Sequence, residues 1–246
     1  MISKNQIKFV KSLQLKKHRI EHRCFIVEST KNVLEILKSD YEIVQLFATK
    51  KWIELNKVDV SVSVNEIVEK ELDRISALKT ASEVLVVVRM KDVLEEINFN
   101  GVNLMLDDIR DPGNLGTLIR ICDWFAVKNI YLSKNSVDVY NPKVVQSSMG
   151  SLHRVNIIYT DLLNILDKVG EDVVVFAAVM NGENIKNIKN IKSTDNSLIV
   201  FGNESLGISK EILNNIDRKI TINKIGNAES LNVSVSAAII LNQFCN

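Results

Sequence analysis

The chain has 246 residues, of which 46% are hydrophobic and 25% are charged, and its formal net charge is +1. These values are typical of an ordinary globular protein, and the length allows one large domain or two ordinary ones. No apolar run reaches the roughly 20 residues that a membrane-spanning helix needs, and the N-terminus is polar and basic from Lys4 onward. We therefore expect a cytoplasmic protein without a signal peptide or a membrane span.

The three cysteines, Cys24, Cys122 and Cys245, are odd in number and lie far apart. This pattern predicts reduced thiols, and neither a disulfide framework nor a metal site.

All nine glycines and both prolines follow residue 100, so only the second half can use glycine where the backbone must approach another group closely. We place a boundary between residues 92 and 101 and predict domains over residues 1–95 and 100–246.

Basic side chains are concentrated in the first 23 residues, where only Glu21 opposes them. This segment is either a solvated helical arm or a surface that binds phosphates. His18 and His22 have the i, i+4 spacing of zinc ligands on a helix, but no third ligand candidate is evident nearby and no base occupies the metalloprotease position. We therefore expect no metal site in this segment.

The first half alternates between helical and extended patterns, which predicts a small α/β/α sandwich of about ninety residues. The apolar run Val84–Val88 is typical of a buried strand, and Asn65 is predicted to cap a helix that extends to Leu78. The other expected elements are helices at 7–15, 31–38 and 52–56 and strands at 24–28, 43–48 and 58–64.

The second half also alternates, and strands separated by helices predict a mainly parallel sheet covered on both faces. Pro142 suits the first turn of a helix, and Asp161 is a good helix cap. The expected strands are 102–106, 130–132, 155–159, 173–179, 198–201 and 220–222. The expected helices are 115–125, 142–149, 162–169, 210–216 and 231–244.

The segment from Asp107 to Arg120 follows a predicted strand and opens a helix. Gly113 and Gly116 permit close approach, and Asn114 is able to cap the helix. A helix N-terminus beside a strand end binds anions and polar ligands, although an ordinary turn with a surface arginine would have the same pattern. The Gly-x-Gly-x-x-Gly fingerprint of dinucleotide-binding proteins is absent.

Two further polar segments are candidate partners of the first. Residues 201–207 follow a buried strand and place Gly202, Glu204 and Gly207 where backbone groups can hold a small ligand, or simply form a tight turn. Ser230 and Asn232 are helix-capping residue types at the start of the last apolar helix, where free N–H groups form a natural ligand seat. We expect the three segments to form one site.

The three segments together resemble the SpoU (TrmH) family of RNA 2′-O-ribose methyltransferases, within the SPOUT superfamily. Asn114, Gly116 and Arg120 match the motif Asn-x-Gly-x-x-x-Arg, the loop at 202–207 matches Gly-x-Glu-x-x-Gly, and residues 229–233 match Glu-Ser-Leu-Asn-Val. The first half is similar to the L30e-type substrate-binding domain of this family. That similarity depends on Phe25-Ile26-Val27-Glu28, Lys31 and Lys79-Thr80, with Ser29 where the family usually has glycine and Gln146 where a basic residue is common.

The resemblance implies a trefoil-knotted C-terminal domain, a homodimer with the last helix in its interface, and S-adenosylmethionine as cofactor. It implies that backbone groups of Gly202, Ile222 and Leu231 hold the adenosyl part, and that other residues of the same loops surround it. These surrounding residues are Asn203, Glu204, Gly207, Ser230 and Asn232. The implied catalytic residues are Arg120, Asn114, Glu204 and Asn232. Whether Arg120 acts as a base, binds phosphate or stabilises an alkoxide stays open, because a guanidinium is always protonated.

The predicted function is therefore methylation of a ribose 2′-hydroxyl in structured RNA, with ribosomal RNA preferred over transfer RNA. The predicted RNA-binding residues are Lys8, Lys11, Lys16, Lys17, Arg19, Arg23 and Arg110. The main alternative is a non-catalytic RNA-binding or ribosome-associated factor with the same fold. A nucleotide-dependent oxidoreductase is disfavoured because the glycine fingerprint is missing.

Overall fold

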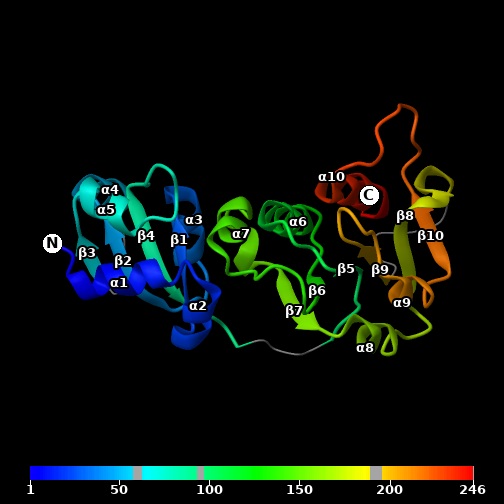
Figure 1. Ribbon diagram of the computed structural model, residues 1–246, viewed down its shortest axis with the longest axis horizontal. Helices are drawn as coiled ribbons and strands as arrows, with labels where there is room; N and C mark the ends of the chain where they lie inside the picture. Colours follow the sequence, from blue (N-terminus) through cyan, green and yellow to red (C-terminus); the bar gives the residue numbers. More distant parts are fainter. Residues whose placement is uncertain (58–62, 93–96, 189–195, 246) are drawn as a thin grey trace. The chain divides into compact units, whose positions relative to one another are not determined.

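The computed structural model describes residues 1–57, 63–92, 97–188 and 196–245 (Figure 1). Their contacts divide the chain into two units, the first comprising Met1–Asp92 with Asp138–His153 and the second comprising Val93–Val137 with Arg154–Asn246. The chain therefore passes between the units three times, whereas the sequence analysis predicted a single boundary, between residues 92 and 101. Within the described ranges, every helix is too short or too polar to span a bilayer.

The N-terminal unit is built around a four-stranded sheet in the order β1-β4-β2-β3. Strand β4 is antiparallel to β1 and β2, whereas β3 is parallel to β2. The strands are β1 (Cys24–Glu28), β2 (Ile43–Ala48), β3 (Val64–Glu66) and β4 (Val84–Arg89). The helices are α1 (Lys4–Ser12), α2 (Lys16–His22), α3 (Thr30–Leu37), α4 (Lys50–Asn56), α5 (Glu69–Ile75) and α7 (Pro142–Ser147), followed by the 3₁₀ turn η1 (Ser151–His153).

Both faces of this sheet are covered, which confirms the predicted α/β/α sandwich. Val10 of α1 and Leu72 of α5 pack with Cys24 and Ile26 of β1 in one buried cluster. Side chains alternate along a strand, so Phe25 and the other buried residues between these positions face the opposite side. Helix α3 contacts β1 and β4, and α7 contacts β1. Burial on both faces explains why β1 and β4 are continuous apolar runs in the sequence.

The prediction that Asn65 caps a helix is wrong. Asn65 lies in β3, opposite Phe47 in the register, and its Nδ2 donates to the carbonyl oxygen of Leu46 at 3.3 Å. The helix begins four residues later, at Glu69. Its Oδ1, the atom that would accept a helix N–H in a cap, instead accepts from Nε2 of Gln6 at 3.3 Å. The strand predicted at 58–64 falls mostly on residues 58–62, outside the described ranges.

The C-terminal unit has a six-stranded sheet in the order β10-β8-β9-β5-β6-β7, and every neighbouring pair is parallel. This confirms the predicted parallel α/β architecture. The strands are β5 (Val102–Leu106), β6 (Asn129–Ser133), β7 (Asn156–Thr160), β8 (Val174–Asn184), β9 (Ser197–Phe201) and β10 (Arg218–Thr221). The helices are α6 (Pro112–Trp124), α8 (Leu162–Leu166), α9 (Lys210–Leu213) and α10 (Val233–Phe244), with a 3₁₀ turn η2 (Ile185–Asn187).

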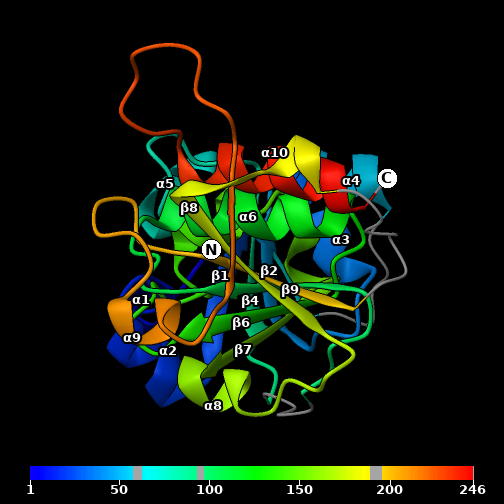
Figure 2. The same cartoon turned by 90° about the vertical axis from the view of Figure 1, so that its right-hand side faces the viewer.

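Figure 2 shows α6 and α10 side by side on one face of this sheet, with α8 and α9 on the other. Leu162 and Ile165 of α8 and Ile212 of α9 pack on the second face, around Met105 and Val200. The ring of Phe244 in α10 meets Phe176 of β8 edge-on at 5.0 Å on the first face. This packing brings the N-termini of α6 and α10, which carry two of the predicted motifs, to one layer.

Candidate active site

The first motif lies at the N-terminus of α6, directly after β5. The Asp111 side chain accepts a hydrogen bond from the backbone N–H of Asn114 at 2.8 Å, and Pro112 occupies the first helical position. A capping aspartate and a proline at this position both favour a helix that begins here. The cap positions Asn114 in the first turn, with its side chain half-buried.

Asn114 joins the three motifs through its side-chain amide. Its Nδ2 donates to Oε1 of Glu204 at 2.8 Å, and its Oδ1 accepts from Nδ2 of Asn232 at 2.9 Å. Ser234 adds a donor, with its Oγ 3.3 Å from the same Oδ1 and 2.7 Å from Oδ1 of Asn232. Residues far apart in the sequence are thus linked, and the orientation of the Asn114 amide follows from its partners.

Ser234 is a site residue that the sequence analysis did not select. It is buried although it is polar, and its backbone N–H donates to Oδ1 of Asn232, which caps α10. A buried hydroxyl at the start of an apolar helix needs a hydrogen-bond partner. That requirement was the signal in the sequence, because Ser234 interrupts an otherwise apolar run.

The second motif is a tight loop after β9. Asn203 and Gly207 exchange two backbone hydrogen bonds, of 3.0 and 2.9 Å, and Oδ1 of Asn203 accepts from the N–H groups of Ser205 and Leu206. A Cβ at Gly202 would lie 2.1 Å from the carbonyl carbon of Gly207. Gly207 itself has φ +71, in the left-handed region that favours glycine. The loop therefore requires both glycines for different steric reasons.

Asn203 also connects this loop to the end of β5. Its Nδ2 donates to the carbonyl oxygen of Asp108 at 2.9 Å, and Asp108 has a φ of +56. A hollow of about 550 Å³ lies here, at the carboxyl ends of the strands. Among the residues that line it are Asp107, Asp108, Ser133, Asp161, Asn203 and Gly207. In open parallel sheets this edge is where ligands bind. Asp107 and Asp108 belong to the first predicted segment, whereas the sequence analysis did not select Ser133 or Asp161.

Two arginines of the first motif differ in their surroundings. Arg110 is exposed but paired with Asp108, 2.9 Å from Nη2 to Oδ2, and this hydrogen-bonded ion pair raises the pKa of Arg110. Arg120 is exposed on α6. Within the described part of the chain Arg120 has no hydrogen-bond or ion-pair partner, so its guanidinium is available to an anionic ligand.

The third motif is only partly joined to the others. Asn232 reaches Asn114, as described above, whereas Ile222 follows β10 and Ser230 and Leu231 precede α10 on a largely exposed loop. No hydrogen bond among the described residues links Ile222, Ser230 or Leu231 to Gly202. The structure therefore brings together Asn114, Glu204 and Asn232, and leaves the expected role of Ile222, Ser230 and Leu231 as a prediction.

The prediction that Arg19 contacts RNA is wrong. Its side chain is 2% exposed, its Nε and Nη2 donate to Oδ2 of Asp138 at 2.9 and 2.6 Å, and its Nη1 donates to the carbonyl oxygens of Leu13 and Gln14. The guanidinium thus joins the turn between α1 and α2 to the segment at Asp138, within the N-terminal unit. A buried group with its donors satisfied in this way cannot bind a phosphate.

The other predicted basic residues of the first helices are exposed. Lys8 and Lys11 lie on one face of α1 with Lys4, at i, i+4 and i+7. Lys16 and Lys17 begin α2, and Arg23, which follows it, pairs with Asp92 on the surface. The exposed set remains a candidate surface for phosphates.

Family models match both halves of the chain. The model of the SpoU rRNA Methylase family matches residues 101–242. The model of the MRM3-like substrate binding domain matches residues 4–86.

Two characterised relatives are similar in sequence. The 23S rRNA (guanosine(2553)-2′-O)-methyltransferase RlmP of Bacillus subtilis (strain 168) is 27% identical over 241 residues, which cover 97% of this chain and 96% of the relative. The 23S rRNA (guanosine-2′-O-)-methyltransferase RlmB of Neisseria meningitidis is 30% identical over 158 residues, which cover 63% and 62% of the two chains.

Solved structures have the same fold over nearly the whole chain. A TrmH-family protein from Porphyromonas gingivalis is 33% identical, with a TM-score of 0.89 and coverage of 99% of this chain and 98% of that one. An rRNA methyltransferase from Sinorhizobium meliloti, solved with bound AdoMet, is 26% identical, with a TM-score of 0.85 and coverage of 99% and 95%.

Proposed function

The chain belongs to the SpoU rRNA methylase family and is an S-adenosylmethionine-dependent RNA 2′-O-ribose methyltransferase, and we propose that its substrate is 23S ribosomal RNA. Two relatives that methylate this RNA support the proposal. The observation that supports catalysis is the hydrogen-bonded set Asn114, Glu204 and Asn232, whereas the choice of RNA depends on the two relatives. A non-catalytic RNA-binding factor would have no need of this polar set.

The loop residues fit S-adenosylmethionine. The backbone at Gly202 is too close to that of Gly207 to admit a side chain, and the peptide groups around Leu231 lie in an exposed segment. Such backbone groups recognise an adenosyl part through its hydrogen-bonding edges. We assign Gly202, Ile222 and Leu231 to this role, with Asn203, Gly207 and Ser230 beside them.

When bound, the cofactor supplies an electrophilic methyl group on a sulfonium whose leaving group is a neutral thioether. The protein must therefore hold the ribose 2′-hydroxyl in line and receive or screen its proton. Glu204 presents a carboxylate whose Oε1 already accepts from Asn114, which leaves Oε2 for a second donor. Arg120 supplies a permanent positive charge for a backbone phosphate or for the charge that develops on the 2′-oxygen.

A homodimer is part of the proposal. Leu231, Val235 and Ile239 follow one another at intervals of four residues and are 48%, 48% and 39% exposed. Val235 and Ile239 form an apolar stripe on one face of α10, and Leu231 lies in the loop before the helix. Water-exposed apolar stripes favour association with a partner. We propose that two copies of the chain pair through this stripe.

The trefoil knot and a cytoplasmic location, which suits a ribosomal RNA substrate, also remain predictions.

The proposal is tested with Arg120→Ala and a matched control, Lys128→Ala, which removes an exposed cation beyond the end of α6. Transfer of a labelled methyl group to 23S rRNA should be abolished in the first variant and retained in the second. Calorimetry should show that Arg120→Ala binds S-adenosylmethionine as the parent does. Full activity of Arg120→Ala would contradict the role of the motif, and a parent chain without cofactor binding would favour the non-catalytic alternative.

The RNA itself is identified in cells. Mass-spectrometric mapping of 2′-O-methylated nucleotides should reveal one site in 23S rRNA that is lost when the gene is deleted and restored by the parent sequence. Loss of a site in transfer RNA instead would overturn the assignment to 23S rRNA while leaving the chemistry intact.

A further inference from the structure

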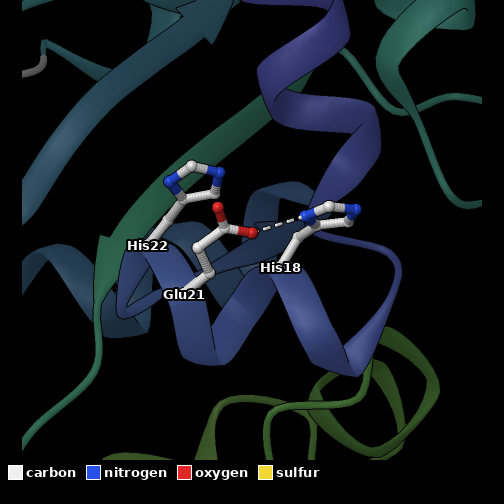
Figure 3. A group of neighbouring side chains, drawn as sticks. All are labelled: His18, Glu21 and His22. Atoms are coloured by element: carbon white, nitrogen blue, oxygen red, sulfur yellow. Dashed lines mark hydrogen bonds and ion pairs between the residues drawn. The ribbon is translucent and has the colours of Figure 1, made fainter.

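Three possible metal ligands lie together on helix α2 of the N-terminal unit (Figure 3). His18, Glu21 and His22 each offer one ligand atom, and these atoms all lie within 4.8 Å of one another. Nδ1 of His18 is 2.9 Å from Oε2 of Glu21. Glu21 is a third candidate ligand that the sequence analysis did not find. It lies three residues after His18, on the same helix face, and its carboxylate also lies within 4.8 Å of the ligand atom of His22.

The histidine side chains are held by their neighbours. The ring of His22 meets the ring of Phe9 edge-on, with centroids 5.2 Å apart. The rings of His18 and His22 lie nearly parallel, 19° apart in orientation, with centroids at 6.2 Å. A tetrahedral zinc ion with bonds of about 2.1 Å needs donor atoms roughly 3.4 Å apart. Side-chain rotation is therefore needed to bring the three donors, now within 4.8 Å of one another, to that spacing.

The positive charges nearest to this cluster are largely directed elsewhere. Arg19 turns inward to Asp138, and Arg23 pairs with Asp92. Arg89 pairs with Glu42 and donates to the backbone carbonyl of His22. Lys16 and Lys17 are exposed, so solvent screens their charges. The Glu21 carboxylate is accordingly the group that faces the two imidazoles.

We propose that His18, Glu21 and His22 bind one zinc ion, through two imidazole nitrogens and one carboxylate oxygen. This donor set is one that zinc uses in proteins, with water in the remaining position. Magnesium and calcium prefer all-oxygen ligands, so imidazoles select against them. For Nδ1 of His18 to act as a ligand, the ring proton moves to Nε2 and the hydrogen bond to Glu21 gives way to the metal.

A zinc ion here would bridge the two ends of one turn of α2. Ligand binding to the folded state stabilises that state, so α2 should unfold later when the ion is present. The ion would also add positive charge to the helix that begins with Lys16 and Lys17. The three residues belong to the N-terminal unit and the methyl-transfer residues to the C-terminal unit, and the zinc test is independent of the proposed substrate.

The experiment uses the full-length chain, freed of metal with a chelator and titrated with zinc chloride by calorimetry at neutral pH. We expect saturable binding of one ion per chain, and Co²⁺ in place of zinc should give the visible absorption of a nitrogen- and oxygen-bound site. Because the loss of even a supporting partner weakens metal sites about 10–100-fold, His18→Gln and His22→Gln should each weaken binding at least about tenfold. Glu21→Gln should weaken it severalfold.

Two controls separate this site from other zinc ligands in the chain. Cys245→Ser removes the one cysteine that is not fully buried, and Glu54→Gln removes an exposed acid on α4. Neither should change the affinity, and circular dichroism should show that every variant is folded. Absence of saturable binding, or undiminished binding by the two histidine variants, would overturn the site. An unchanged affinity in Glu21→Gln would overturn the three-ligand arrangement.

Discussion

Replacement of Arg19 by methionine tests whether this arginine is a structural residue. The side chains of Arg19 and Asp138 are only 2% and 15% exposed, and the guanidinium makes four hydrogen bonds. Removal of one partner of a buried ion pair costs about 3–5 kcal/mol. Methionine keeps the apolar stem but leaves Asp138 unpaired and the carbonyls of Leu13 and Gln14 without their donor. We expect a loss of about 4 kcal/mol in the free energy of unfolding.

The measurement is urea unfolding followed by circular dichroism, with Arg23→Met as matched control. Arg23 also pairs with an aspartate, but both side chains are more than half exposed, so its loss should cost only about 0–1 kcal/mol. The double variant Arg19→Met/Asp138→Leu should recover much of the loss, since apolar replacement of a whole buried pair is often neutral. Equal losses for Arg19→Met and Arg23→Met would refute the reasoning.

RNA binding provides the complementary test. Under conditions in which it is folded, Arg19→Met should bind RNA with the affinity of the parent. Lys16→Gln and Lys17→Gln should leave stability unchanged, weaken RNA binding and reduce its salt dependence, since each lost phosphate contact lowers the logarithmic slope by about 0.9. Weaker RNA binding by folded Arg19→Met would restore this arginine to the RNA surface.

Three further predictions concern other strained or buried positions. Ser29 has φ 75 and ψ 142, a conformation suited to glycine, so Ser29→Gly should raise the free energy of unfolding in urea by about 1 kcal/mol; a loss would show that the serine is unstrained. Burial raises the pKa of Glu28 against hydrogen bonds from Ser76 and Ala77. When the native pKa of a carboxyl is raised, the free energy of unfolding falls as the pH rises above about 4.3, the pKa of the carboxyl in the unfolded chain. Unfolding curves from acid to neutral pH should therefore show the free energy of unfolding of the parent falling relative to that of Glu28→Gln. Parallel pH dependence of the two proteins would contradict this. Gly202→Ala should abolish S-adenosylmethionine binding in calorimetry, because its Cβ would overlap the Gly207 backbone, whereas Gly226→Ala, with open space around its Cβ, should bind normally.

The pattern of apolar residues predicted most of the helices and strands, because burial of an element in the core determines which of its positions are apolar. The strands Cys24–Glu28, Ile43–Ala48 and Val102–Leu106 were predicted with the bounds that the structure gives them, since each is a continuous, largely apolar run in a covered sheet. Asn65 failed for a tertiary reason, because its side chain satisfies a neighbouring strand. Local pattern holds no information on such a partner.

The same distinction between local pattern and distant partners applies to the residues of the candidate site. Asn114, Glu204 and Asn232 were selected because they lie in motifs with fixed spacing. The structure joins them by hydrogen bonds, and their catalytic roles stay predictions. Arg19 was misassigned because charge alone does not reveal burial, and its partner Asp138 lies 119 residues away. Glu21 was interpreted only as a counter-charge, although its spacing to His18 and His22 was visible in the sequence.

The placement of Asp138–His153 with the N-terminal unit has a consequence for how the chain matures during synthesis. Domains generally fold as they emerge from the ribosome, but here the first unit is incomplete until Asp138, the partner of Arg19, and the rest of the segment up to His153 have been translated. By then β5, α6 and β6 of the second unit have already been synthesised. A fragment that ends near residue 95 would lack part of the N-terminal unit. Experiments on the isolated unit therefore require residues 138–153 to be fused to the fragment.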